Sequence, residues 1–298
     1  LFRGSGDRAL SGDAIKLWEA DDAVVRECVV ENTRDLVVWY SRRVRLEGNQ
    51  VFDSRYGTHF MHAHDAVVRD SHLAHNIVGV FVMYSSGVRI EHNRLLGSRG
   101  PAGVGIGFKE SDSVSIDGNW IVANTVGAYL DRTPRSAKTP VRFSRNVLAL
   151  NDVGLRYHGS EQGVTFAHND FTRNRTAVEV EGGGDALGTR FEHNYWSDYA
   201  GYDLDRDGTG DVAHEVKRLS SALLESRPAL RLFDGTLSLA LIDAMARVFP
   251  VFSAERLLVD ERPRMQPMTA GPPRIPGGAV ALRPARASTA AESMGGHP

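Results

Sequence analysis

Val114-Ser115-Ile116-Asp117-Gly118-Asn119 contains the pattern that decides the fold, a frame of the form apolar-x-apolar-x-x-Asn. The frame recurs on both sides of this stretch, always with the same residue type or a small substitute at its end. The successive end positions, here called anchors, are Cys28, Asn49, Ser71, Asn93, Asn119, Asn146, Asn169 and Asn194. Neighbouring anchors are 21 to 27 residues apart. A strand-like motif that returns at such a period predicts a solenoid.

Two further marks accompany the anchors. Glycine stands eight residues after four of them, and an alternating strand follows each time. These glycines are Gly57, Gly79, Gly127 and Gly154. Asparagine also stands five residues after four anchors, at Asn76, Asn124, Asn151 and Asn174. We therefore expect each unit to be one coil of about three short strands in a right-handed parallel β-helix, stacked at the strand spacing of ~4.8 Å. Asn tolerates left-handed backbone geometry, and stacked Asn side chains can form a hydrogen-bonded ladder.

Other repeat classes fit less well, because leucine-rich repeats need Leu at fixed spacing and helical repeats need a period near 3.6. The predicted organisation is a parallel β-helix over 1–196 and an acidic metal-binding loop region over 197–218. A helical C-terminal cap or docking segment follows over 219–264. Residues 265–298, rich in Pro, Gly and Ala, are expected to be a disordered tail.

The composition limits the classes of function. The formal net charge is −2 and no basic stripe is visible, so a nucleic-acid partner is not expected. Cys28 is the only cysteine, which excludes an internal disulfide framework, and we expect it to be a small core residue rather than a reactive thiol. No apolar run reaches the ~20 residues that span a bilayer. We interpret the sequence as a fragment whose preceding part would contain any export signal.

The segment after the repeats has a different character. Residues 219–224 and 237–248 have helical spacing, with Pro228 between them. The second stretch is apolar beyond one narrow stripe, so it either only caps the solenoid or also docks to a partner. The candidate docking residues are Leu241, Met245, Phe249 and Phe252.

Alternate carboxylates mark a candidate calcium loop, in the order Asp203, Asp205, Asp207 and Asp211. Such a loop with Gly208 at its turn can wrap a hard cation such as Ca²⁺. His214 stands where an EF-hand would have its last Glu, so a simple EF-hand is disfavoured. The alternatives are a structural calcium site and an ordinary solvated acidic turn.

The stretch Gly57 to His64 holds three His and one Met within six residues. Side chains alternate across a strand, so the repeat predicts which of them point outward. The predicted inward positions, nine and eleven residues after the anchors, include Val37, Trp39, Thr58, Phe60, Val80, Val82, Ala128, Leu130, Leu155, Tyr157, Val178 and Val180. The predicted outward positions include Val38, Tyr40, His59, Met61, Phe81, Met83, Tyr129, Asp131, Arg156, His158, Glu179 and Glu181.

Met61 and Met83 should therefore lie side by side on the outer face, facing solvent, with His59 on the same strand as Met61. Two thioethers and an imidazole suit Cu(I) and are poor ligands for Mg²⁺ or Ca²⁺. Exposed Met is also typical of an adaptable docking surface, and an apolar strip covered by another segment is a third possibility.

An enzyme remains the alternative class. Charged residues that could line a polysaccharide lyase or epimerase cleft fall on the same predicted sheet. They are Lys109, Asp131, Arg132, Arg156 and His158. Charged side chains on an outer sheet are also the ordinary state of a soluble solenoid, so we expect no catalytic residues.

Residues 194–203, Asn-Tyr-Trp-Ser-Asp-Tyr-Ala-Gly-Tyr-Asp, run into the acidic loop and resemble the signature of the NosD family of nitrous oxide reductase maturation proteins. Similar resemblance lies in Tyr56 to Met61, in Gly79 to Tyr84 and in Gly127 to Asp131. The resemblance covers residues 13 to about 262. His62 and His64 depart from it, so no ligand role is transferred to them.

The resemblance implies an exported periplasmic β-helix protein associated with an ABC transporter, active in denitrification. It implies that the chain is a non-enzymatic factor for assembling the copper centres of nitrous oxide reductase. The expected partners are the membrane subunit of the transporter, a copper chaperone and the reductase. The expected ions are Cu(I), bound transiently, and structural Ca²⁺.

Overall fold

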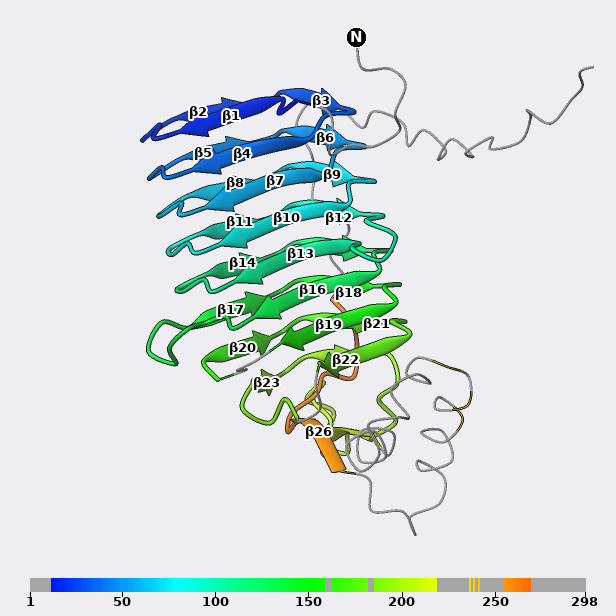
Figure 1. The fold of residues 1–298 in the computed structure, drawn as a ribbon. Helices are drawn as coiled ribbons and strands as arrows, with labels where there is room; N and C mark the ends of the chain where they lie inside the picture. The colour runs from blue at the N-terminus through cyan, green and yellow to red at the C-terminus, as the bar shows by residue number, and fades with distance from the viewer. Residues whose placement is uncertain are drawn as a thin grey trace, which may run out of the picture.

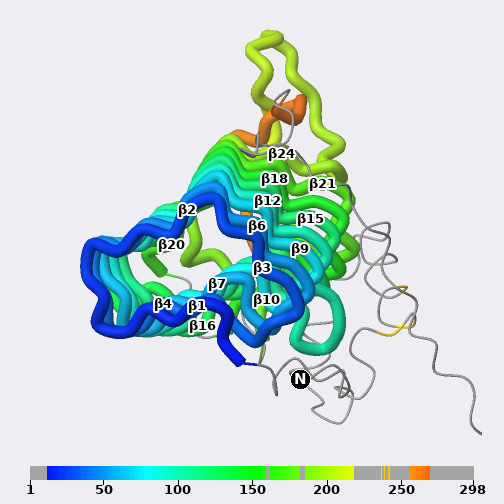
Figure 2. Tube along the Cα trace, turned by 90° about the horizontal axis from the view of Figure 1, so that it is seen from above, coloured from blue at the N-terminus to red at the C-terminus, as the bar shows by residue number. Residues whose placement is uncertain are grey.

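A computed structural model describes residues 12–158, 162–181, 185–218, 255–268 and the single residues Thr236, Ser238 and Leu241. Over these residues the chain winds into a right-handed parallel β-helix, with one coil stacked on the next along a common axis (Figure 1). Seen along the axis, the coils superpose as a rounded triangle with one sheet on each side (Figure 2). The fold predicted from the anchors is confirmed.

Each coil contributes one strand to each of three sheets. Sheet A contains β1 (Ile15–Trp18), β4 (Asp35–Trp39), β7 (Tyr56–Met61), β10 (Val78–Met83), β13 (Val104–Lys109), β16 (Val126–Asp131), β19 (Val153–His158) and β22 (Thr176–Val180). Sheet B contains β2 (Val24–Arg26), β5 (Arg45–Glu47), β8 (Val67–Arg69), β11 (Arg89–Glu91), β14 (Ser115–Asp117), β17 (Val141–Ser144), β20 (Val164–Ala167), β23 (Arg190–Glu192), β26 (Glu255–Asp260) and β25 (His214–Arg218). Sheet C contains β3 (Val29–Glu31), β6 (Gln50–Phe52), β9 (His72–Ala74), β12 (Arg94–Leu96), β15 (Trp120–Val122), β18 (Val147–Ala149), β21 (Asp170–Thr172) and β24 (Tyr195–Trp196).

The anchor asparagines from Asn93 to Asn194 form a continuous ladder inside the corner between sheets B and C, and Ser71 links Asn49 to it. Asn146 shows the repeating unit: its Oδ1 accepts hydrogen bonds from the backbone N and Nδ2 of Asn119, both at 2.9 Å. Its Nδ2 donates to the Ile116 carbonyl and to Oδ1 of Asn169, also at 2.9 Å. Every polar atom of the amide is thus paired although the side chain is buried. A second ladder of the same kind joins Asn124, Asn151 and Asn174.

The anchors themselves do not take the left-handed conformation that was one reason for expecting Asn there. In the ladder corner the positive φ belongs to the preceding residue, for example Arg145 at 53° and His168 at 58°. The anchor is Asn because of its amide, which bridges coils. The spaced glycines have a steric reason as well, since a Cβ on Gly127 would lie 2.6 Å from the carbonyl oxygen of Gly154 in the next coil.

The interior is filled by the inward positions of all three sheets. From the second coil onward the predicted inward positions of sheet A are confirmed up to Val178, with Phe60, Val80 and Tyr157 fully buried. Aromatic rings stack along the axis at the far end, where the rings of Phe143 and Phe166 lie 4.3 Å apart. Cys28 is partly buried against this core, as expected.

The first coil, counted from the anchor Cys28 and containing β4, departs from the predicted alternation of inward and outward side chains. The register of β4 and β7 shifts between Asp35 and Val37, because the first coil has one residue fewer before its strand alternates. Val38 is therefore aligned with Phe60 and points inward, whereas Trp39 is aligned with Met61 and lies on the outer face. The predicted inward place of Trp39 and the predicted outward place of Val38 are therefore both wrong. The first coil has Leu36 at the position where later coils have a glycine, and it lacks the additional residue that follows this glycine in the later coils.

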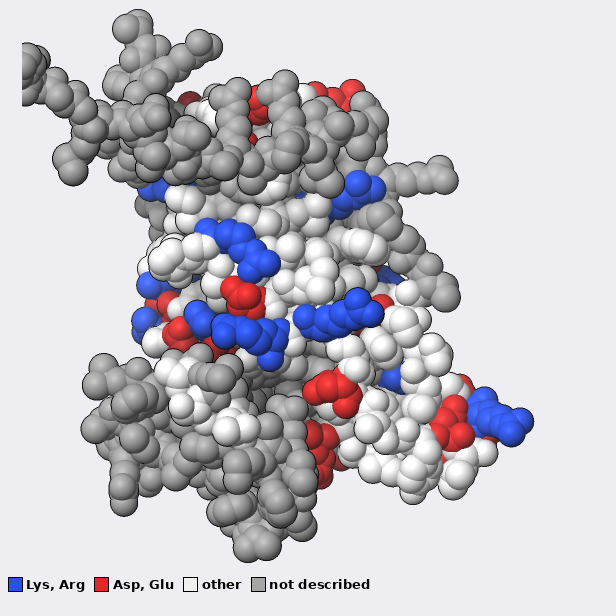
Figure 3. Space-filling view, turned by 90° about the vertical axis from the view of Figure 1, so that its right-hand side faces the viewer, with Lys and Arg blue, Asp and Glu red and all other residues white. Residues whose placement is uncertain are grey.

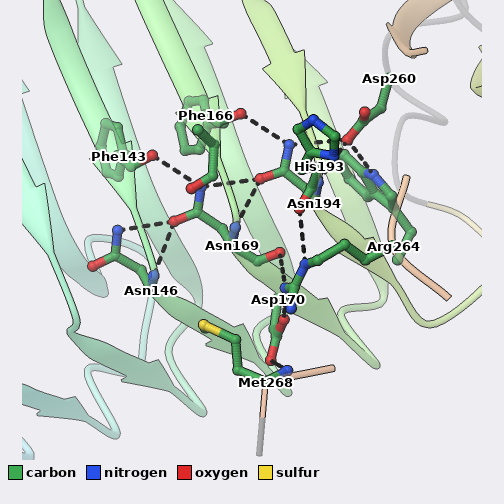
Figure 4. Close-up of polar contacts among 12 residues, drawn as sticks. Phe143, Asn146, Phe166, Asn169, Asp170, His193, Asn194, Asp260, Arg264 and Met268 are labelled. Atoms are coloured by element: carbon green, nitrogen blue, oxygen red, sulfur yellow. Dashed lines mark hydrogen bonds and ion pairs between the residues drawn. The ribbon is translucent and has the colours of Figure 1, made fainter. Parts of the chain in front are cut away.

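The C-terminal part returns to close the last coil. β26 pairs in parallel with β23 and antiparallel with β25, so the prediction of a helical cap over 219–264 is wrong for Glu255–Asp260. Oδ2 of the fully buried Asp260 ends the ladder, accepting from the backbone N and Nδ2 of Asn194 at 3.0 Å and from Nε1 of Trp196 at 3.1 Å (Figure 4).

Two residues that follow β26, Arg264 and Met268, form polar contacts with earlier coils. Arg264 donates to the carbonyl of His193 at 2.8 Å and pairs with the carboxylate of Asp170 (Figure 4). The backbone N of Met268 donates to the same carboxylate at 2.9 Å. The expected tail over 265–298 therefore begins with ordered contacts, and its part beyond residue 268 lies outside the described residues. Among the described residues, no helix is both long and apolar enough to cross a membrane.

Candidate metal centre

The structure brings His59, Met61 and Met83 together on the outer face of sheet A. Met61 of β7 and Met83 of β10 are direct partners in the parallel register, as are His59 and Phe81. Nε2 of His59 lies 3.3 Å from Sδ of Met83. Bonds from a metal ion to imidazole nitrogen or sulfur are about 2.0–2.3 Å long, so one ion could touch both atoms at this separation.

The exposure of the three side chains differs from the prediction that all would face solvent. Met61 and Met83 are partly exposed, but His59 is only 7% exposed. Aromatic neighbours cover it, because the Tyr56 ring stacks on the imidazole at 4.7 Å and the Trp39 ring meets it edge to face at 5.9 Å. An ion that approached from solvent would therefore meet the thioethers before the imidazole.

Electrostatics keep His59 neutral. Burial lowers the pKa of His59 to about 4, although the carboxylate of Asp35 opposes this shift. That carboxylate is 4.0 Å from Nδ1 and also pairs with Arg55, whose Nε donates to it at 2.9 Å. The negative charge favours the imidazole proton on Nδ1. Nε2, the nitrogen beside Met83, can act as a ligand in the tautomer that has its proton on Nδ1.

The residues present fit a soft monovalent ion. Nδ1 of His59 is buried and has no hydrogen-bond partner among the described residues. This is not the nitrogen beside Met83, so the fit to an ion rests on Nε2 of His59 and on Sδ of Met83. Imidazole and thioether donors favour Cu(I), whereas the hard cations Mg²⁺ and Ca²⁺ prefer oxygen. The ligand role of the three residues remains a prediction that this geometry supports.

Sequence reasoning missed three residues that shape the site. Trp39 was placed inside the helix, and Tyr56 was noticed only as part of a family motif. Gly107 is the third, because a Cβ there would lie 2.4 Å from the Phe81 ring, so glycine provides the space into which Phe81 leans. The signal for Gly107 was available, since it stands in the outward column directly after Phe81.

The charged residues of sheet A lie farther along the same face and pair with one another. Lys109 contacts Asp131 at 3.6 Å, Arg156 contacts Glu179 at 3.0 Å, and His158 contacts Glu181 at 2.9 Å. Arg132 in the following turn contacts Glu110 at 3.5 Å. These pairs are the neutralised surface of a solenoid, and they give no specific support to a lyase or epimerase.

In the acidic loop, three of the four predicted calcium ligands lie close together. Ligand oxygens of Asp203, Asp205 and Asp207 lie within 4.8 Å of one another. Asp211 is not in this group, and its Oδ2 accepts a hydrogen bond from the backbone N of Leu204 at 2.7 Å. Asp203 in turn accepts from the backbone N of Gly208 at 2.9 Å, where φ is +85°. Three of the four predicted calcium ligands are thus close together.

The predicted docking residues are only partly visible. Leu241 has helical geometry and is 62% exposed. Met245, Phe249 and Phe252 lie outside the described residues.

Charges of both signs are mixed on the described surface. On the face shown in Figure 3, Lys and Arg side chains gather in a short band with Asp and Glu beside them. Ion pairs on the described surface, such as Arg99 with Asp152 at 3.2 Å, mix the two signs. A nucleic-acid site would need an extended stripe of positive charge.

Known proteins were compared with the chain. Residues 2–201 match the model of a family described as periplasmic copper-binding protein (NosD). A "Probable ABC transporter binding protein NosD" from Pseudomonas aeruginosa is 34% identical over 139 residues, which is 45% of this chain and 31% of that protein. A protein of the same description from Stutzerimonas stutzeri is 39% identical over 61 residues, 20% of this chain and 14% of that protein.

The chain thus spans less than a third of the length of these relatives. Among solved structures, HetL, a pentapeptide repeat protein from the cyanobacterium Nostoc, matches over 65% of this chain and 94% of its own length. Its identity is 10% and its TM-score 0.23, a likeness from which nothing is argued. The family match covers most of the chain, including His59, Met61 and Met83, and the chain belongs to the NosD family.

Proposed function

We propose that this chain is a non-enzymatic periplasmic factor that holds and passes Cu(I) during assembly of the copper centres of nitrous oxide reductase. The observation that carries the proposal is the contact of 3.3 Å between Nε2 of His59 and Sδ of Met83, with Met61 beside Met83 in register. The description of the family as periplasmic and copper-binding supports it.

The chemistry of the site suits transfer rather than permanent storage. Three soft donors leave coordination positions open, so a donor or acceptor protein can supply a further ligand while copper moves. The imidazole is already neutral and does not have to release a proton when the ion binds. In this account copper is cargo, and the residues of the chain bind it, orient it and limit its contact with water.

The partners in this proposal are a copper chaperone as donor, the reductase as acceptor, and the membrane subunit of an ABC transporter. The names of the two relatives, which describe binding proteins of an ABC transporter, support the last of these. We assign docking on the transporter to the segment with Leu241, Met245, Phe249 and Phe252. The exposure of Leu241 is consistent with that role.

The test is the double substitution Met61→Leu with Met83→Leu. Leu keeps the side-chain volume and removes the sulfur, so the fold should survive. Changes outside the ligand set already cost about 10- to 100-fold in metal affinity, so loss of two direct donors should cost more. Cu(I) affinity would be measured by competition with a chromogenic chelator, and copper in the reductase would be measured in cells with the variant.

Met265→Leu is the matched control, because Met265 lies at the other end of the solenoid, where its backbone N donates to Gly208. The control should bind Cu(I) like the wild type and support normal loading. If the double variant also binds and loads normally, the thioethers are packing residues and the proposal is wrong.

We further propose that Asp203, Asp205 and Asp207 bind Ca²⁺ in a structural site. Their convergence and the left-handed glycine at the turn support this, since hard oxygen ligands in a tight loop suit calcium. Asp211 would contribute indirectly, by fixing the backbone at Leu204.

A further inference from the structure

We propose that Trp39 is a fourth member of the copper site and that its indole ring contacts the bound Cu(I) ion through a cation–π interaction. The inference rests on the proposed function, because it needs the ion to be held by His59, Met61 and Met83. It predicts an optical signature that the other three residues cannot produce.

The position of Trp39 results from the register shift of the first coil. The shift turns Trp39 outward and aligns it with Met61, so the outer column reads Trp39, Met61, Met83 on three consecutive coils. Its ring centroid is 5.9 Å from that of His59 at an interplanar angle of 88°. The indole therefore borders the imidazole and lies on the strand position next to Met61, and it is partly exposed to solvent.

The Trp39 ring already attracts a positive charge in this structure. Nζ of Lys16 lies 5.1 Å from its centroid and 5.0 Å from that of Trp18. Cation–π attraction acts within about 6 Å of a ring centroid and is strongest for Trp. The ammonium group is thus in contact with an aromatic surface that borders the copper ligands.

Packing rather than hydrogen bonding holds the ring. Nε1 of Trp39 is buried and has no hydrogen-bond partner among the described residues. The neighbouring rings are Trp18, at 5.6 Å, and His59.

An aromatic member also gives a chemical advantage for Cu(I). The ring covers an open coordination position without adding a strong donor, and it keeps water from the ion. Cu(I) and Ag(I) share the single positive charge and the softness that suit such a contact, whereas Zn²⁺ prefers a further nitrogen or oxygen donor. The predicted ligand class is therefore a soft monovalent cation.

The experiment follows tryptophan absorption and fluorescence while Cu(I), or Ag(I) as an ion that does not change oxidation state, is added to the full chain. Trp18→Phe is the background, so that the neighbouring indole does not contribute. In this background we expect quenching of fluorescence and a perturbed indole absorption band at one equivalent of ion. Trp120→Phe, a change on sheet C, is the control and should leave both signals intact.

Trp39→Phe should abolish the absorption change, and Trp39→Leu should weaken Cu(I) binding by about 2- to 30-fold, the range of a cation–π contact. Trp39→Phe should lose less affinity, because it keeps a ring. If the wild type binds Cu(I) but both Trp39 variants keep its affinity and the absorption change persists in Trp39→Phe, the inference is overturned while the proposed function stands. If the wild type binds no Cu(I), the proposed function itself fails.

Discussion

At the residue scale, the burial of His59 lowers its pKa, and its position beside Met83 makes it a candidate copper ligand. Its pKa of about 4 means that the imidazole is neutral throughout the physiological pH range, and its nearest polar contact at Nε2 is a sulfur atom. A neutral imidazole nitrogen and a thioether sulfur together form a ligand pair that suits Cu(I).

Each side-chain amide of the asparagine ladder links neighbouring coils, and a substitution at Asn146 tests how much one such amide stabilises the fold. Replacing Asn146 with Leu removes four hydrogen bonds of its side chain and leaves the buried backbone N–H of Asn119 without its acceptor. Unpaired buried polar groups cost about 1–3 kcal/mol, so the free energy of unfolding should fall by about this amount. Chemical denaturation would measure it.

Arg142→Leu is the control for that substitution, because Arg142 lies on β17, the strand just before Asn146, and is exposed. It should leave the denaturation midpoint nearly unchanged. A midpoint for Asn146→Leu as high as that of the control would contradict a stabilising ladder.

At the scale of the element, the acidic loop lies between the last coil and the strand that closes it. Residues 203–211 lead directly into β25, which pairs with β26, and β26 places Asp260 at the end of the ladder. An ion that fixes the loop would therefore also stabilise the closure of the solenoid. The loop and the returning strand act as one unit in this account.

Calcium should accordingly raise the thermal unfolding midpoint. A ligand that binds only the folded state at about 100 times its Kd adds ~2.7 kcal/mol to the free energy of unfolding. Chelation should reverse the gain and make residues 197–215 more sensitive to proteolysis. Calorimetry with added Ca²⁺ measures the binding directly, with Asp205→Asn as the variant that should lose it.

Asp198→Asn is the control, because Asp198 is exposed and lies outside the three converging carboxylates. It should keep the calcium response. A wild-type chain that gives no heat and no shift in midpoint on addition of Ca²⁺ would show that the loop is an ordinary acidic turn.

At the scale of the whole molecule, the solenoid could be predicted because most coils repeat one or both of two constraints. The anchors recur because buried amides must pair, and Gly127 and its equivalents recur because adjacent coils approach too closely for a Cβ. The pairing of Met61 with Met83 followed from the same periodicity. The repeat period reveals both constraints, because each one acts between equivalent positions of neighbouring coils.

The features that escaped prediction are those where the period breaks. Trp39 was misplaced because the first coil has one residue fewer than the second, which shifts every later side chain to the opposite face. β26 was missed because its strand is remote in sequence from β23, and an Asp rather than an Asn closes the ladder. Burial of His59 depends on the rings of Tyr56 and Trp39, which periodicity alone does not position.

The central claim is that one Cu(I) ion is held by an imidazole and two thioethers on this face. X-ray absorption at the copper edge of the Cu(I)-loaded chain reports the ligand atoms directly. We expect one imidazole nitrogen and two sulfur scatterers in the wild type, with the sulfur shell lost in the Met61→Leu, Met83→Leu double variant. A wild-type spectrum that contains only nitrogen and oxygen scatterers would contradict it.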